Sequence, residues 1–300
     1  MEDESVRSHD TVLIQRRCIM PRALTTTPMV IVASYVILTA LTFFAAACGS
    51  SSTPGPTGTM AASTPLADLA PTGKLRVAIS PEPPFLAKKD AAGTFSGIAI
   101  DLGTDLAKKL GVTMVPTKYD TVDALLAARN DWDVAVVPSN DTIRSALDLT
   151  AAFMLVDHSY LVPADSKIKT IADADQPGMK IASVKGEGHT AALMGILKQA
   201  QIVLVDTEND GVAKLNSGEV DAYFSGVARL LPLASSVAGS HVIDGSAFTA
   251  KFAVGLSKGH DAGLAFLKQF VESERSSGAV TQAIAALGLP GGVTVAPSGS

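Results

Sequence analysis

An alternation of strand and helix patterns along residues 74–137 is the feature that most constrains the fold. Residues 74–79 alternate apolar with other side chains, as a strand does, and residues 98–110 repeat leucines at helical spacing before Gly111. The series continues as strand, helix and strand in residues 112–115, 121–129 and 133–137. Three strands joined by helices predict a mainly parallel sheet with helices on both faces, an αβα unit of three layers.

The same alternation returns after an extended segment near residues 156–163. The pattern predicts strands at 180–184, 202–205 and 220–224, and helices at 190–199 and 210–216. C-terminal helices are expected between residues 261 and 287. Two α/β units of similar size, joined by an extended crossover, predict two lobes that face a cleft.

The first 72 residues have a different character. An apolar run at residues 29–47 ends in three alanines before Cys48, and Ser, Thr, Pro, Gly and Ala follow. We expect residues 1–47 to be a signal peptide, either extended at its N-terminus or translated from Met20. Cys48 is then a lipidation site and residues 48–72 a flexible linker, so the protein is extracytoplasmic and anchored to the membrane as a lipoprotein. An uncleaved signal anchor is the alternative.

Composition narrows the range of functions. The chain has a formal net charge of −5 and no basic stripe, so we expect no nucleic-acid partner. Its 2 cysteines are Cys18, in the leader, and Cys48, so no disulfide is expected in the mature domain. The 5 histidines lack metal-ligand spacing. We therefore expect no metal, no cofactor and a monomer.

Candidate site residues follow the ends of the predicted strands. In parallel sheets ligands bind beyond the carboxyl ends of the strands, where loops and helix N-termini meet. On this basis the candidate ligand-binding residues are Glu82, Phe85, Ser139, Arg144, Gly186, Glu187, Gly188, His189 and Ser225.

Five segments in order also resemble a known family: residues 73–85, 95–112, 141–150, 166–188 and 215–226. Together they are similar to the family 3 extracellular solute-binding proteins of bacterial ABC importers, which are best known for the uptake of polar amino acids. The resemblance implies a periplasmic-binding-protein-like fold of type II, in which two α/β lobes are joined by two hinge strands.

The resemblance also implies domain boundaries. Lobe I comprises residues 73–156 plus 248–288, lobe II comprises residues 157–247, and residues 289–300 are expected to be a disordered tail. The hinges are expected near residues 157–159 and 247–249, and closure about them buries the solute.

Three candidates acquire roles from the resemblance. Arg144 matches the arginine that binds a ligand carboxylate, for which a planar guanidinium is well suited. Ser139 is expected to offer a hydroxyl or backbone donor to the ligand, or to serve as a helix N-cap. Phe85 is expected to cover the solute side chain or to pack in the core.

The second lobe departs from the family pattern at two places. Where amino acid binders usually have Gly followed by Ser-Thr or Thr-Thr, this chain has Gly186-Glu187-Gly188-His189. Gly226 stands where many have the aspartate that pairs with the α-ammonium group. If Glu82 or Glu187 replaces that charge, an amino acid or a small cationic amine fits. If neither points inward, a simple organic acid is favoured, because a buried unpaired ammonium is costly.

The expected function is capture of a small polar solute, an amino acid or related carboxylate, and its delivery to ABC permease subunits, without enzymatic activity. One alternative is a periplasmic cyclohexadienyl or arogenate dehydratase, with Glu82 or Glu187 as general acid. Another is a lipoprotein that presents its ligand to a sensor.

Overall fold

The computed structural model describes residues 64–300. Its strands are β1 (Lys74–Ile79), β2 (Lys88–Lys89), β3 (Phe95–Ser96), β4 (Thr113–Lys118), β5 (Val134–Pro138), β6 (Leu147–Leu149), β7 (Met154–Val162), β8 (Lys180–Val184), β9 (Gln201–Val205), β10 (Ala222–Gly226), β11 (His241–Val242), β12 (Phe248–Ser257) and β13 (Val293–Val295). Its helices are α1 (Pro65–Leu69), α2 (Ile98–Leu110), α3 (Val122–Ala127), α4 (Asp141–Ala146), α5 (Gly188–Ile196), α6 (Glu208–Asn216), α7 (Val227–Ser236), α8 (Asp261–Ser276) and α9 (Ala279–Ala286), with a 3-10 turn at Ile171–Ala174. The predicted signal peptide and Cys48 lie outside the described residues.

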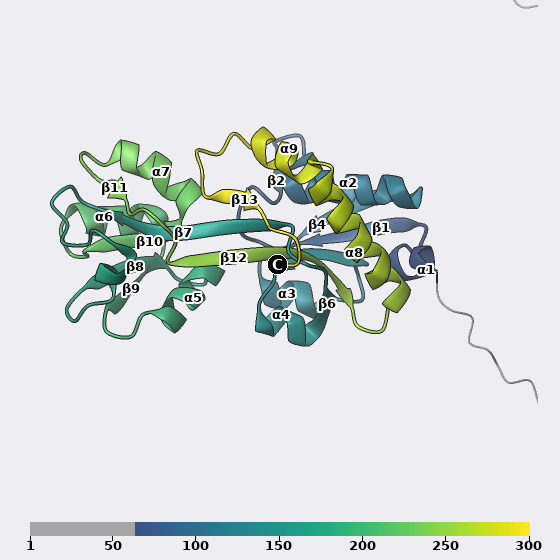
Figure 1. Ribbon diagram of the computed structural model, residues 1–300, viewed down its shortest axis with the longest axis horizontal. Helices are drawn as coiled ribbons and strands as arrows, with labels where there is room; N and C mark the ends of the chain where they lie inside the picture. Colours follow the sequence, from purple (N-terminus) through teal and green to yellow (C-terminus); the bar gives the residue numbers. More distant parts are fainter. Residues whose placement is uncertain (1–63) are drawn as a thin grey trace, which may run out of the picture. The chain divides into compact units, whose positions relative to one another are not determined.

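One sheet contains most of these strands, in the order β4-β1-β5-β12-β7-β10-β8-β9. At one end β1 pairs in parallel with β4 and β5, and at the other β8 pairs in parallel with β9 and β10. The long strands β7 and β12 lie antiparallel to each other between these two blocks, and Figure 1 shows them running side by side from one block to the other.

Apolar side chains form cores on both faces of the first parallel block. In β1, Val77 and Ile79 belong to one core and Ala78 to the other, because neighbouring side chains in a strand point to opposite faces. Helices α2 and α8 contribute to the first core, and Trp132 packs in the second. We call this layered unit, built on β1, β4 and β5 with α2, α3, α4, α8 and α9, lobe I.

The second parallel block repeats this arrangement. In β10, Ala222 and Phe224 belong to one core and Tyr223 to the other. We call the unit built on β8, β9 and β10 with α5, α6 and α7 lobe II. Close packing is visible at Gly211 of α6, where a Cβ atom would lie 2.6 Å from the Tyr223 ring. Each lobe therefore has the three-layer αβα architecture that the alternation of patterns predicts.

Several predicted elements have nearly the observed bounds. The strand expected at residues 74–79 is β1, and the helix expected at 98–110 is α2. Gly111 ends α2 in the left-handed conformation at φ 70°, with its N–H directed to the Ala107 carbonyl. Glycine is favoured there because a side chain would be strained.

The predicted linker ends earlier than expected. We placed its end at residue 72, but α1 begins at Pro65, and Leu69 is 0% exposed against lobe I. Asp68 receives the Gly263 N–H in the first turn of α8 at 2.8 Å and lies 3.4 Å from His260 Nδ1. The segment is short in sequence but gains buried apolar area and a hydrogen bond by docking. No helix in the part of the chain that the structure describes is long and apolar enough to cross a bilayer.

The expected disordered tail at residues 289–300 is also ordered in part. Strand β13 pairs antiparallel with β7, from Val293 opposite Val156 to Val295 opposite Met154. Gly292 accepts the Asp157 N–H at 2.8 Å, and its backbone packs so closely on Val227 of α7 that a Cβ would lie 2.4 Å from that side chain. The tail thus contacts both β7 and a helix of lobe II.

The docking of α1 gives the first testable prediction. Because Asp68 caps α8 from outside the helix, Asp68→Ala should lower the free energy of unfolding by about 1.5 kcal/mol, the size of a lost helix cap. Urea unfolding is the measurement. The control is Leu66→Ala on the same helix, where the side chain is 47% exposed and a change within about 0.5 kcal/mol is expected. Equal stability of both variants would contradict a structural role for α1.

Candidate functional site

A cavity of about 780 Å³ opens where the strands of both lobes end. Its walls come from the loops after β1, β5, β8 and β10 and from the long strands β7 and β12. The carboxyl ends of parallel strands carry loops free of the sheet, so they are the usual place for ligand groups in such folds. Apolar side chains form much of the wall, among them Phe85, Val156, Met194, Phe248 and Phe252.

Most of the predicted site residues meet at this cavity. Those that line it are Glu82, Phe85, Ser139, Gly186, Glu187, Gly188 and His189. Among the described residues Arg144 and Ser225 are not part of the wall. Arg144 is an exposed residue of α4 whose Nη2 donates to Ser139 Oγ, and Ser225 is fully buried in β10 next to Gly226, which does line the cavity.

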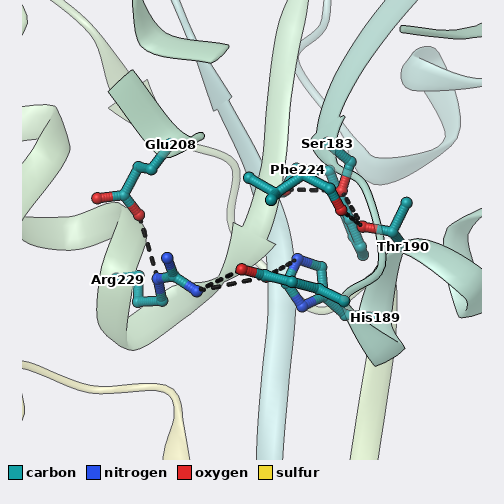
Figure 2. A network of polar contacts seen from close by, with 8 residues as sticks. Ser183, His189, Thr190, Glu208, Phe224 and Arg229 are labelled. Carbon is teal, nitrogen blue, oxygen red and sulfur yellow. Dashed lines mark hydrogen bonds and ion pairs between the residues drawn. The ribbon is translucent and has the colours of Figure 1, made fainter. Parts of the chain in front are cut away.

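Glu187 belongs to a network of charges in lobe II. Arg229 of α7 donates from Nη1 to both carboxylate oxygens of Glu187 at 3.2 and 3.3 Å, and from Nε to Glu208 of α6 at 3.1 Å. Figure 2 shows Arg229 joined to Glu208 on one side, with His189 on its other side. The Glu187 side chain is 15% exposed and that of Arg229 31%, so the pair is largely shielded from water.

Hydroxyl groups fix the start of α5 beneath this network. Thr190 Oγ1 donates to the Val184 carbonyl at 2.6 Å and lies 2.7 Å from Ser183 Oγ in β8 (Figure 2). These contacts tie the first turn of α5 to the end of β8. They thereby hold Glu187 and His189 in place at the cavity wall.

Two histidine rings lie close together in the cavity wall. The rings of His158 on β7 and His189 on α5 lie 5.1 Å apart, and the His158 ring lies 5.4 Å from that of Phe248. His158 Nδ1 is 3.0 Å from the Val156 carbonyl. Burial lowers the pKa of each imidazole to about 4, helped at His158 by the neighbouring His189 and at His189 by Arg229. Both rings are therefore neutral at pH 7.

Glu82 faces this lobe II network from the loop after β1. Burial raises the pKa of its carboxyl group above the ordinary value, and the charge of Glu187 raises it further, whereas Arg229 and Lys118 act in the opposite direction. Glu82 of lobe I and Glu187 and Arg229 of lobe II line the same cavity, so both lobes present charges to it.

The wall also contains residues that sequence reasoning missed, among them Arg229 and His158. Arg229 lies in α7, which was not predicted, although the position just after the last strand of lobe II was recognised as a site loop. Arg229 lies three residues beyond Gly226 of that loop. His158 lies in a strand expected only as a crossover, and its isolated position offers no motif.

The chemistry of the wall is that of binding. Carboxylates, a paired arginine, neutral imidazoles and apolar rings surround the cavity. Among residues 64–300 no group of three or more His, Cys, Asp or Glu side chains is arranged to hold a metal ion. The cavity between two αβα lobes defines a two-lobed α/β binding protein.

Known proteins agree with this class. The model of the bacterial extracellular solute-binding proteins, family 3, matches residues 75–286. The chain belongs to this family, as its sequence segments predicted.

Solved structures share the fold. An ancestral amino acid-binding protein, a precursor of cyclohexadienyl dehydratase, matches with a TM-score of 0.60 and 21% identity over 75% of this chain and 99% of its own. A protein of Wolinella succinogenes assigned as the binding component of an ABC transporter, complexed with lysine, gives 0.61 and 20% over 72% and 95%. An amino acid ABC transporter substrate-binding protein of Streptococcus pneumoniae, bound to L-arginine, gives 0.57 and 20% over 73% and 95%. The predicted two-lobed fold of type II is confirmed.

Proposed function

We propose that this protein captures a small polar solute, an amino acid or related carboxylate, between its lobes and delivers it to an ABC importer outside the cytoplasmic membrane. Membership of an extracellular solute-binding family supports a solute-binding role and an extracytoplasmic location. The binding component and the substrate-binding protein found among similar structures, with lysine and arginine bound, favour delivery of an amino acid to a permease.

The cavity is the observation that carries this proposal. It lies at the strand ends of both lobes and is lined by residues from each, including Glu82 of lobe I and Glu187 of lobe II. A solute held there contacts both lobes at once. Such a site binds more tightly in a closed than in an open form, which is what capture and release require.

The proposed lobes are residues 73–156 plus 248–288 and residues 157–247, with hinges in β7 and β12. These strands pair where Asp157 faces Thr249, and Thr249 Oγ1 donates to Asp157 Oδ1 at 2.6 Å. The chain crosses between the lobes at this pair. Bending there would move the lobes without breaking either core.

The proposed receptor for a solute carboxylate is Arg144 with Ser139. Ser139 lines the cavity and already accepts a hydrogen bond from the Arg144 guanidinium. Arg144 is exposed, so it has donors free for a ligand at the cavity edge. The other proposed contacts with the solute come from wall residues, namely Phe85, Gly186, Gly188 and His189. Ser225 is buried in β10, and we propose that it supports the wall without contacting the solute.

Membrane attachment rests on the sequence alone. Cys48 follows a run of small residues that suits a lipoprotein processing site, and we propose that acyl chains on this cysteine anchor the protein. Mass spectrometry of the N-terminal peptide after expression in a bacterial host tests this part. An unmodified Cys48 in the mature protein would contradict it.

Thermal shift with the twenty amino acids, simple amines and organic acids tests the proposed function. A ligand that binds only the native state raises the melting temperature by mass action. We expect at least one compound to bind with one site per chain in calorimetry. Steady conversion of arogenate or prephenate to an aromatic product would instead favour the dehydratase alternative.

Arg144→Ala is predicted to weaken binding of a carboxylate found in that screen by about 2 kcal/mol, or about thirtyfold, as expected for a hydrogen bond to a charged group. The protein fold should be unaffected, because the side chain is exposed. Isothermal titration calorimetry is the measurement, and the control is Arg129→Ala, an exposed arginine outside the cavity wall. Unchanged affinity in Arg144→Ala would remove this residue from the site.

A further inference from the structure

The cavity wall carries more acidic than basic side chains. Its charged residues are Glu82, Asp120, Asp123, Glu187, Arg229 and Lys251. The two histidines add no charge at pH 7, because burial keeps them neutral. An anionic solute therefore meets a wall of its own sign, unless the basic groups are free to receive it.

Arg229 is not free. Its guanidinium donates to Glu187 and to Glu208, at distances of 3.1 to 3.3 Å. The two carboxylates more than offset the single positive charge. A solute carboxylate at this point would compete with two protein carboxylates that are already in place.

Glu187 lines the cavity and does not cap the backbone of the helix that follows it. It precedes α5, yet its side chain makes no capping hydrogen bond to that helix. Its carboxylate oxygens meet Arg229, and one lies 3.0 Å from His189 Nε2. The family resemblance predicts hydroxyl groups here, which donate hydrogen bonds to a ligand carboxylate. In this chain the Glu187 carboxylate, a hydrogen-bond acceptor, occupies this region.

Glu82 has no counterion. Among residues 64–300 it makes neither a hydrogen bond nor an ion pair, although it is partly buried in the wall. Its loop follows β1 of lobe I, whereas Glu187 belongs to lobe II. A carboxylate shielded from water without a partner is unfavourable, and a second carboxylate across the cavity adds to the cost.

We propose that the solute carries a protonated amine, and that Glu82 and Glu187 receive this amine from opposite lobes. This inference rests on the proposed function and specifies the chemistry of its ligand. An ammonium group offers several donors and a full positive charge. Glu82 has no ion-pair partner among residues 64–300, and Glu187 shares the Arg229 guanidinium with Glu208. The apolar residues Phe85, Phe248 and Phe252 then contact the carbon skeleton of the solute.

The Glu82 and Glu187 carboxylates also couple the choice of ligand to closure of the lobes. With the cavity empty, closing the lobes brings Glu82 and Glu187 toward each other, and their repulsion opposes the movement. A bound cation replaces repulsion with two attractions, so it favours the closed form specifically. A solute without an ammonium group lacks this effect, so it populates the closed form less.

The test measures binding of chosen probes by calorimetry to the protein and its variants. The cationic probes are L-arginine, L-lysine and putrescine, and the anionic probes, which carry no amine, are glutarate and succinate. We expect at least one cationic probe to bind and neither anionic probe to bind. Glu82→Gln and Glu187→Gln, which keep side-chain shape, should each weaken the bound cationic probe at least tenfold.

The matched control is Glu219→Gln, which removes an exposed carboxylate paired with Lys214 outside the cavity and should change affinity less than twofold. Melting temperatures without ligand show whether each variant is folded. Binding of an anionic probe alone overturns the amine proposal and leaves the solute-binding role intact. Cation binding that both glutamine variants retain in full also overturns it, and binding of no probe overturns this proposal together with the proposed amino acid ligand.

Discussion

Acidification from pH 7.5 to pH 4.5 is expected to lower the free energy of unfolding by about 5 kcal/mol through two histidines alone. His158 and His189 each have a pKa of about 4 in the folded protein, against an ordinary value of 6.5. Between these values the unfolded chain binds protons that the folded protein does not bind. Linkage gives about 2 to 3 kcal/mol for each imidazole over this range.

The sign follows from which state takes up protons. Above pH 6.5 both states hold neutral imidazoles, and the histidines do not affect stability. Below it, protonation stabilises the unfolded state. The free energy of unfolding therefore falls with decreasing pH until the pH reaches about 4, the pKa of these histidines in the folded protein. Glu82 acts in the opposite direction, because its pKa is raised on folding and a proton on it favours the folded state at low pH.

Chemical denaturation at both pH values measures the effect, and substitution isolates it from other groups. The double variant His158→Asn and His189→Asn should lose most of the expected slope. His241→Asn, which changes an exposed histidine of β11, should keep the full slope. The same pH dependence in the double variant and the wild type would show that the imidazoles are not responsible.

Arg229→Met is expected to lower the free energy of unfolding by about 3 kcal/mol. The substitution keeps an unbranched apolar stem but leaves Glu187, 15% exposed, without its cation, and removes the group that opposes the repulsion between Glu187 and Glu82. Removal of one partner from a shielded ion pair commonly costs 3 to 5 kcal/mol. The lower end applies here, because the Arg229 side chain is 31% exposed.

Urea unfolding of Arg229→Met at pH 7.5 is the measurement. The control is Lys214→Met, which breaks a pair with Glu219 whose side chains are 32% and 54% exposed and should cost less than about 1 kcal/mol. Arg229→Lys retains the positive charge but not the simultaneous donation to Glu187 and Glu208. The free energy of unfolding of this variant should therefore lie between those of Arg229→Met and the wild type. If Arg229→Met and Lys214→Met lower the free energy of unfolding equally, water screens the Arg229–Glu187 pair as strongly as the exposed Lys214–Glu219 pair.

The sequence predicted the elements that have one clear periodicity. Strand β1 and helix α2 were recognised with their ends, because apolar alternation and a terminal glycine act locally. Loops after parallel strands gather at one edge of the sheet, so strand ends alone brought Glu82, Ser139 and Glu187 to one cavity.

The remaining elements depend on contacts between residues far apart in the chain, which a local sequence pattern does not indicate. Helix α7 has Pro232 inside its apolar run, and a proline in a helix interior argues against a helix, so α7 was not predicted and Arg229 went unnoticed. Strand β13 is short and preceded by glycines, and its order depends on its pairing with β7 and the contact of Gly292 with α7. Helix α1 is equally short, and its docking depends on Asp68 meeting the distant α8.

The order of the C-terminal segment has a mechanical consequence. Strand β13 adds a third polypeptide tract beside β7 and β12, and Gly292 places that tract against α7. If the lobes swing about the hinges proposed in β7 and β12, the movement must flex three tracts or detach β13. We expect such a hinge to be stiffer than two strands alone, and the unliganded protein to open less widely.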